Sequence, residues 1–190
     1  MKRILSLGLA VALLASTGVA QAELKSGLQA GEAIGAYTVE KVAGNPTDGV
    51  DQGQKLCYRC KLGNRPVVTI FAHSADPSVT KLVKQLDSYV AANEAKKAAS
   101  FVNLLGDDVD QLKKQADMLV EKSQANQIAV VIPIDHKAAG PENLKLNPEA
   151  DITVLIFNKG KIAANHAFGK GELNDAAITK IMADAEKVLN

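Results

Sequence analysis

The stretch that decides the fold is Leu62–Phe71, with the sequence LGNRPVVTIF. Its first half is rich in turn formers, and its second half is a β-branched run typical of a strand buried on both faces. Asp76 and Pro77 follow, a helix-capping residue and a proline suited to a first turn. The stretch therefore predicts a central strand that leads into a helix, which apolar spacing places over residues 78–97.

Weaker patterns extend this unit in both directions. Upstream, residues 37–42 alternate as a half-buried strand does, and residues 55–58 are expected to return beside them after a turn-rich segment. Downstream, the predicted elements are strands at 101–105 and 128–132, a helix ending near Gln124, a helical turn near Glu142, a hairpin of strands 152–157 and 162–168, and a last helix capped by Asn174. The order predicts an α/β fold: a mixed central sheet flanked by helices, with an N-terminal β-hairpin.

The first 22 residues have the pattern of a cleavable export signal. Lys2 and Arg3 precede an apolar run over residues 4–15, and Ala20-Gln21-Ala22 ends the segment with small residues around the expected cleavage point. The apolar run is shorter than the roughly 20 residues that span a bilayer. We therefore expect an exported protein, periplasmic or secreted, whose mature chain is residues 23–190.

Composition bounds what the mature chain does. It has 168 residues (190 − 22), the size of one domain. Loss of Lys2 and Arg3 changes the formal charge from +1 to −1, and the remaining cations form no continuous block. We expect no nucleic-acid partner, no membrane span in the mature chain and no cofactor.

The two cysteines, Cys57 and Cys60, have only each other as disulfide partners within the chain. In an extended strand their Cα atoms would lie about 10 Å apart, beyond the reach of a disulfide, so a bridge requires a turn or helical geometry. Arg59, between them, is a candidate to stabilise a thiolate. A structural disulfide, a redox-active dithiol exchanging with a protein thiol or disulfide, and a metal site or packed thiols all remain open. Metal binding is disfavoured because zinc usually takes four protein ligands, and no second Cys or His pair at finger spacing accompanies Cys57 and Cys60.

Three motifs carry a family resemblance. Gly31–Val39 (GEAIGAYTV) is similar to a Gly-x-x-aliphatic-x-x-Phe-x-Leu opening, Leu62–Val68 to Leu-x-Gly-Lys-Pro-Val-Val, and Phe157–Ile162 (FNKGKI) to Phe-x-x-Gly-x-aliphatic. In this order, from Gly31 to Leu189, they resemble the thioredoxin-like superfamily and its redoxin branch, which includes peroxiredoxins of the alkyl hydroperoxide reductase type. The resemblance implies a thioredoxin-like fold.

The departures from that family concern its active site. Thioredoxins carry their reactive Cys-x-x-Cys just after the central strand, where this chain has AHSADPS at residues 72–78, and Ile152 replaces the expected cis-proline. The usual cysteine position is empty, and Cys57 and Cys60 precede the strand, roughly 20 Å from that corner. Two functions follow: thiol–disulfide exchange through the displaced pair, or a non-catalytic binding module with a structural disulfide. A peroxidase using either cysteine is the least favoured, because the family builds its peroxide site at the other corner.

Other polar residues have simpler explanations. Asp107 and Asp108 are expected to cap a helix rather than bind metal. His73 follows the central strand and is interpreted as a solvated or hydrogen-bonded loop residue, while His136 and His166 lie far from it in sequence.

Overall fold

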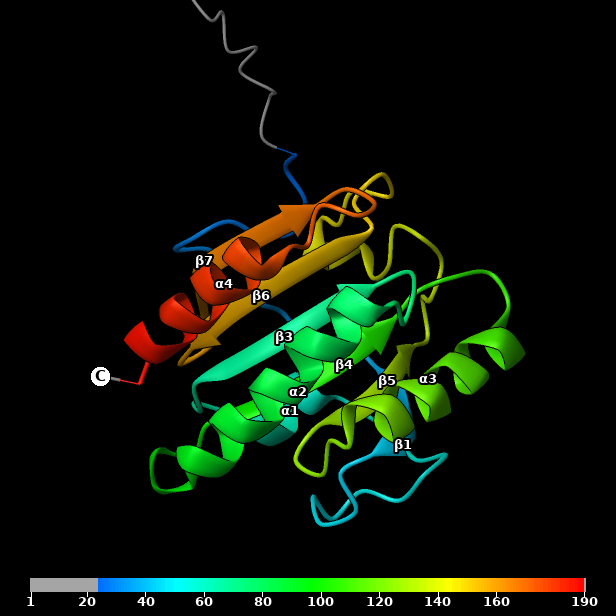
Figure 1. The fold of residues 1–190 in the computed structure, drawn as a ribbon, viewed down its shortest axis with the longest axis horizontal. Helices are drawn as coiled ribbons and strands as arrows, with labels where there is room; N and C mark the ends of the chain where they lie inside the picture. Colours follow the sequence, from blue (N-terminus) through cyan, green and yellow to red (C-terminus); the bar gives the residue numbers. More distant parts are fainter. Residues whose placement is uncertain (1–23, 190) are drawn as a thin grey trace, which may run out of the picture.

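A computed structural model describes residues 24–189 of the chain. The expected export signal, residues 1–22, lies outside the described residues. The described part forms one seven-stranded mixed sheet with the strand order β2-β1-β5-β4-β3-β6-β7, seen in Figure 1 with helices crossing in front. In that sheet β3 pairs in parallel with β4 and antiparallel with β6.

Apart from short helices at residues 58–62 and 94–96, the elements follow the predicted order. They are β1 (Val39–Gly44), β2 (Lys55–Leu56), α1 (Tyr58–Leu62), β3 (Val67–Ala72), α2 (Pro77–Ala92), η1 (Glu94–Lys96), β4 (Ala99–Leu104), α3 (Val109–Ser123), β5 (Ala129–Pro133), η2 (Glu142–Leu144), β6 (Ile152–Asn158), β7 (Lys161–Phe168) and α4 (Asp175–Lys187).

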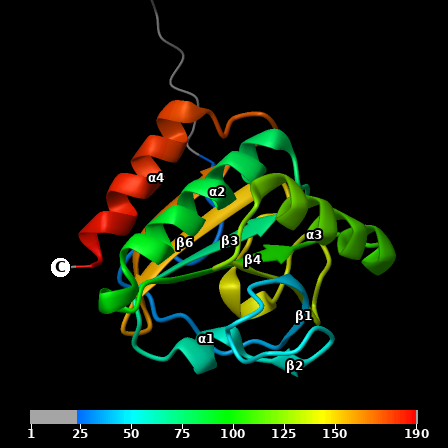
Figure 2. The ribbon, with the colours of Figure 1, turned by 60° about the horizontal axis from the view of Figure 1, so that its bottom comes forward.

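The two faces of the sheet are covered in different ways. One core cluster packs the apolar faces of α2, α3 and α4 against strand residues such as Ile70, Val102 and Val154. The opposite cluster packs Phe71, Phe101 and neighbouring strand residues against irregular segments, α1 and η2. Figure 2 shows the three long helices on one side of the sheet, with α1 and β2 on the other.

Local signals explain the element ends. Asp76 caps α2 by accepting hydrogen bonds from the backbone N–H of Ser78 (2.8 Å) and Val79 (2.9 Å). At the other end, both the backbone N–H and the side-chain amide of Asn93 donate to the carbonyl of Tyr89. The single helix predicted to Lys97 is therefore wrong beyond Ala92: a short 3-10 turn follows, and Lys97 adopts a left-handed conformation with φ 59°.

The strand predicted at residues 55–58 also needs correction. Only Lys55 and Leu56 pair with β1, and the chain enters α1 at Tyr58. The mixed sheet, the hairpin of β6 and β7, the helical turn near Glu142 and the caps at Asp108 and Asn174 are confirmed. Within residues 24–189, none of the helices combines the length and hydropathy that crossing a membrane requires.

Candidate redox site

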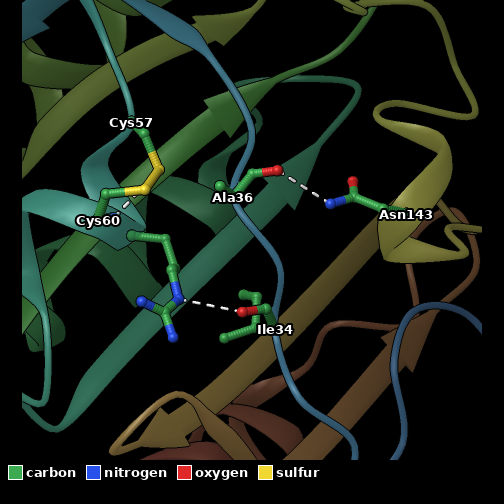
Figure 3. The surroundings of a disulfide bond; sticks show 6 residues. Ile34, Ala36, Cys57, Cys60 and Asn143 are labelled. Atoms are coloured by element: carbon green, nitrogen blue, oxygen red, sulfur yellow. Dashed lines mark hydrogen bonds between the residues drawn. A yellow bond between two sulfur atoms is a disulfide. The ribbon is translucent and has the colours of Figure 1, made fainter.

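A disulfide joins Cys57 to Cys60 across the start of α1 (Figure 3). Cys57 is the N-cap of this helix, and its sulfur accepts a hydrogen bond from the backbone N–H of Cys60 at 3.1 Å. The helical turn brings the two Cα atoms to 5.2 Å, within the range that a disulfide bridges. In a continued strand the same two Cα atoms would lie too far apart for a disulfide, so the bond depends on the helical turn.

The two sulfur-bearing residues differ in exposure. Cys60 is exposed, whereas Cys57 is partly covered. Thiol–disulfide exchange begins with a thiolate reaching one sulfur of the bond, so access decides which sulfur is attacked. Approach from solvent therefore favours Cys60.

Tyr58, the residue after Cys57, anchors the pair to the body of the protein. Its side chain is buried and its ring stacks on Phe101 with centroids 5.3 Å apart. Its hydroxyl donates a hydrogen bond to Oδ2 of Asp48. Burial, followed by the hydrogen bond and negative charge of Asp48, raises the pKa of Tyr58 far above its usual value. The phenol thus stays protonated and keeps donating.

Asp48 is itself held by a buried cation. Nζ of Lys41, which is 3 % exposed, lies 2.8 Å from Oδ1 of Asp48. The same ammonium donates to the carbonyls of Asn45 (2.6 Å) and Val50 (2.8 Å), so all three of its protons have acceptors. A buried charge is tolerated when it is paired and fully hydrogen-bonded, and this group fixes the turn that receives Tyr58.

In the disulfide form, the side chain of Arg59 hydrogen-bonds to a segment distant in sequence. Its Nε donates to the carbonyl of Ile34 at 3.0 Å, the contact drawn in Figure 3. Its guanidinium also lies against Gly160 in the β6–β7 turn, so close that a Cβ added there would lie 2.3 Å from Nη2. Arg59 therefore ties α1 to two distant segments in the disulfide form, and its action on a thiolate stays a prediction.

The corner after β3 has no sulfur. The backbone there runs into the capped start of α2 at Asp76, and His73 hydrogen-bonds through Nε2 to the carbonyl of Ala138 at 3.1 Å. The disulfide lies before β3, at the opposite end of this strand. The structure therefore agrees with the displacement expected from the sequence.

The other two histidines each have a polar contact of their own. His136 contacts the carbonyl of Gly106 through Nδ1 at 2.7 Å, and Nε2 of His166 lies 3.0 Å from Oδ2 of Asp184. Among residues 24–189, no group of three or more His, Cys, Asp or Glu side chains is arranged to hold a metal ion.

Reasoning from the sequence did not select Lys41, Asp48 or Tyr58 as site residues. Asp48 falls in a segment whose turn-forming residues already explain it. Alternation over residues 37–42 places Lys41 on the same face as the buried Tyr37 and Val39, where a charged side chain is unusual. That position was the available signal, because a buried lysine needs an acid or other acceptors.

Comparison with known proteins gives similarity in structure but not in sequence. No family model matches the chain, and no curated protein matches it in sequence. Peroxidoxin BcpB of Mycobacterium tuberculosis aligns with a TM-score of 0.60 and 13% identity, covering 85% of this chain and 98% of that one. The thioredoxin domain of thiol-disulfide oxidoreductase BVU-2223 of Bacteroides vulgatus aligns at 0.54 and 14% identity, covering 86% and 99%.

A third similar structure is a secreted disulfide oxidoreductase of Mycobacterium tuberculosis, with a TM-score of 0.55 and 11% identity, covering 80% of this chain and 95% of that one. These alignments span nearly the whole described part of the chain. They confirm the thioredoxin-like fold that the resemblance implied.

Proposed function

We propose that this thioredoxin-like chain exchanges electrons with a protein thiol partner through Cys57 and Cys60. The observation that carries the proposal is a disulfide between residues three apart, with exposed Cys60 at the surface and Tyr58 between the cysteines anchored in the core. The similar structures that are thiol–disulfide oxidoreductases support it.

The exchange is written with the partner as reductant. A thiolate of the partner attacks Sγ of Cys60, the Cys57–Cys60 bond breaks, and Cys57 leaves as a thiolate. A second partner thiolate then attacks its own sulfur in the mixed disulfide and releases Cys60. The partner gains a disulfide and loses two electrons and two protons, and the pair becomes a dithiol.

The position of Cys57 suits it to be the leaving group. The backbone N–H of Cys60 points at its sulfur at 3.1 Å, and a hydrogen bond to a thiolate stabilises the charged form. In the reverse direction the same partly covered Cys57 resolves the mixed disulfide on Cys60.

The competing function is a binding module in which the disulfide is only structural. The empty corner after β3 favours it. A bridge over so short a loop, however, stabilises the fold by only about 2 kcal/mol in the chain-entropy estimate. A structural role therefore predicts a potential below about −300 mV and no turnover, whereas exchange predicts a reducible pair.

Trapping the mixed disulfide tests the proposal. Cys57→Ser leaves Cys60 as a free thiol without its resolving partner. Its thiolate attacks a peptide disulfide and releases the other half as a thiolate, so this variant should accumulate the mixed disulfide about tenfold faster than Cys60→Ser. The double Cys57→Ser/Cys60→Ser variant controls for non-specific labelling. Failure of both single variants to trap peptide, with the wild-type pair remaining oxidised in reducing glutathione buffer, would leave the structural role.

We also propose that the chain acts after export and cleavage behind Ala22, as a domain of residues 23–190. The charged, apolar and small-residue order of residues 1–22 supports this location. An oxidising compartment is where a surface disulfide persists.

A further inference from the structure

A cleft of about 1010 Å³ opens beside the disulfide, at the end of the sheet where β3, β4 and β5 begin and α2 finishes. Tyr58, Lys61 and Leu62 of α1 line it, so the five-residue helix that carries Cys60 is also one wall of the cleft. Its volume is at the upper end of the roughly 300–1,000 Å³ of small-molecule sites. A segment of polypeptide fits it better than a small thiol.

The charge of the cleft is strongly one-sided. Four exposed cations line it: Lys61, Arg65, Lys96 and Lys97. Of the two acids in its wall, Asp48 is already neutralised by Lys41, which leaves Glu94. Within the described residues none of the four cations forms an ion pair.

This bias is local. The mature chain carries a formal charge of −1 (+1 less Lys2 and Arg3). The positive charge of the cleft is therefore a local feature of a chain that is not basic as a whole. Clefts lined by one sign of charge concentrate oppositely charged partners and speed their association. Screening limits the effect to about 8 Å at physiological salt, so the attracted charges must lie near the reacting sulfur.

We infer that the partner cysteine exchanging with Cys60 lies in a segment with acidic residues beside it, which the cleft binds. This inference rests on the proposed function and names its substrate class. Lys61, directly after Cys60 in the chain, joins the binding surface to the reacting bond.

The test uses three peptides of equal length, each with one cysteine flanked by glutamates, glutamines or lysines. The rate of reduction of the wild-type disulfide is measured for each peptide and divided by the rate of the same peptide with an uncharged reference disulfide, bis(2-hydroxyethyl) disulfide. That division removes the effect of flanking charge on the peptide thiol itself. The normalised rate should be about tenfold higher for the glutamate peptide than for the lysine peptide, and the preference should shrink as salt rises.

Charge reversal locates the preference. Arg65→Glu/Lys96→Glu should abolish or invert the ratio of glutamate to lysine peptide. The matched Lys114→Glu/Lys180→Glu variant, with the same charge change on exposed positions of α3 and α4 outside the cleft, should keep the wild-type ratio. Serine versions of the peptides, followed by fluorescence anisotropy, report binding without chemistry and should show the same ranking.

The outcomes separate the two proposals. Exchange with all three peptides at equal normalised rates, or a ratio that the cleft variant leaves unchanged, overturns the acidic substrate alone. Serine peptides that bind without a charge preference overturn it as well. Exchange with no peptide overturns both the proposed function and the inference built on it.

Discussion

At the scale of single residues, the candidate site depends on an internal relay of hydrogen bonds rather than on the sulfur atoms alone. Lys41 holds Asp48, and Asp48 accepts from Tyr58, one of the two residues between the cysteines. Without the Tyr58 hydroxyl, Oδ2 of Asp48 loses its hydrogen-bond donor, and the Asp48 side chain is mostly buried. Losing one partner of a buried polar pair costs about 1–3 kcal/mol.

Tyr58→Phe should therefore destabilise the fold by about that amount near neutral pH, and the deficit should shrink in alkali. The native state holds the Tyr58 proton more tightly than the unfolded chain, whose tyrosine pKa is about 10. Stability from this group is complete below about pH 10 and falls above it, by at most about 1.4 kcal/mol per pH unit.

Urea unfolding of wild type and Tyr58→Phe across a pH series measures this difference. Tyr37→Phe is a comparison variant, since burial also raises the pKa of Tyr37 but its hydroxyl donates to Asn103 instead. Wild-type and Tyr58→Phe curves that stay parallel from neutral to strongly alkaline pH would contradict the prediction.

At the scale of elements, α1 is held from outside by the β6–β7 turn. Gly160 has φ 73°, a conformation that side chains disfavour, and it lies against the guanidinium of Arg59. The five-residue helix has little intrinsic stability of its own. Its position therefore depends on Tyr58 on one side and on this turn on the other.

Gly160→Ala should lower the free energy of unfolding by more than Gly171→Ala does. Both glycines have positive φ, at 73° and 77°, but an added Cβ meets nothing within 4 Å at Gly171. The backbone cost of alanine at positive φ, about 1 kcal/mol, is common to both variants. The difference between their free energies of unfolding therefore reports the displacement of Arg59. Chemical denaturation measures both, and equal losses would show that Arg59 is moved at no cost.

The sequence predicted the elements whose signals are local and long enough. β3 has a continuous β-branched run, and α2 and α4 have capping residues before a helical apolar period. α1 was missed because five residues cannot display that period, and because a cysteine N-cap is outside the usual capping set. The position of the pair before β3 was predictable, but the contacts of Tyr58 and Arg59 depend on segments distant in sequence.

At the scale of the whole molecule, the sheet separates two regions. The corner after β3 ends in a capped helix without sulfur, and the disulfide with its cationic cleft lies at the other end of the parallel strands. A disulfide exposed in this way persists outside the reducing cytosol. Export, which we propose from the order of residues 1–22, would place the disulfide in such a compartment.

Expression of the full precursor in a bacterial host with a periplasm should yield a product that begins at Glu23. Amino-terminal sequencing of the periplasmic fraction measures this. Leu13→Arg/Leu14→Arg, which places charges in the apolar run, should keep the precursor in the cytoplasm. A wild-type product that retains Met1 and stays cytoplasmic would contradict the export proposal.

The bridge over Tyr58 and Arg59 uses every sulfur that could form a disulfide in the chain. During oxidative refolding a single molecule can therefore form only one intramolecular disulfide. A disulfide isomerase should not speed its refolding, because there is no non-native intramolecular pairing to rearrange. A disulfide between two protein chains is the one wrong pairing left, and dilution of the protein should suppress it.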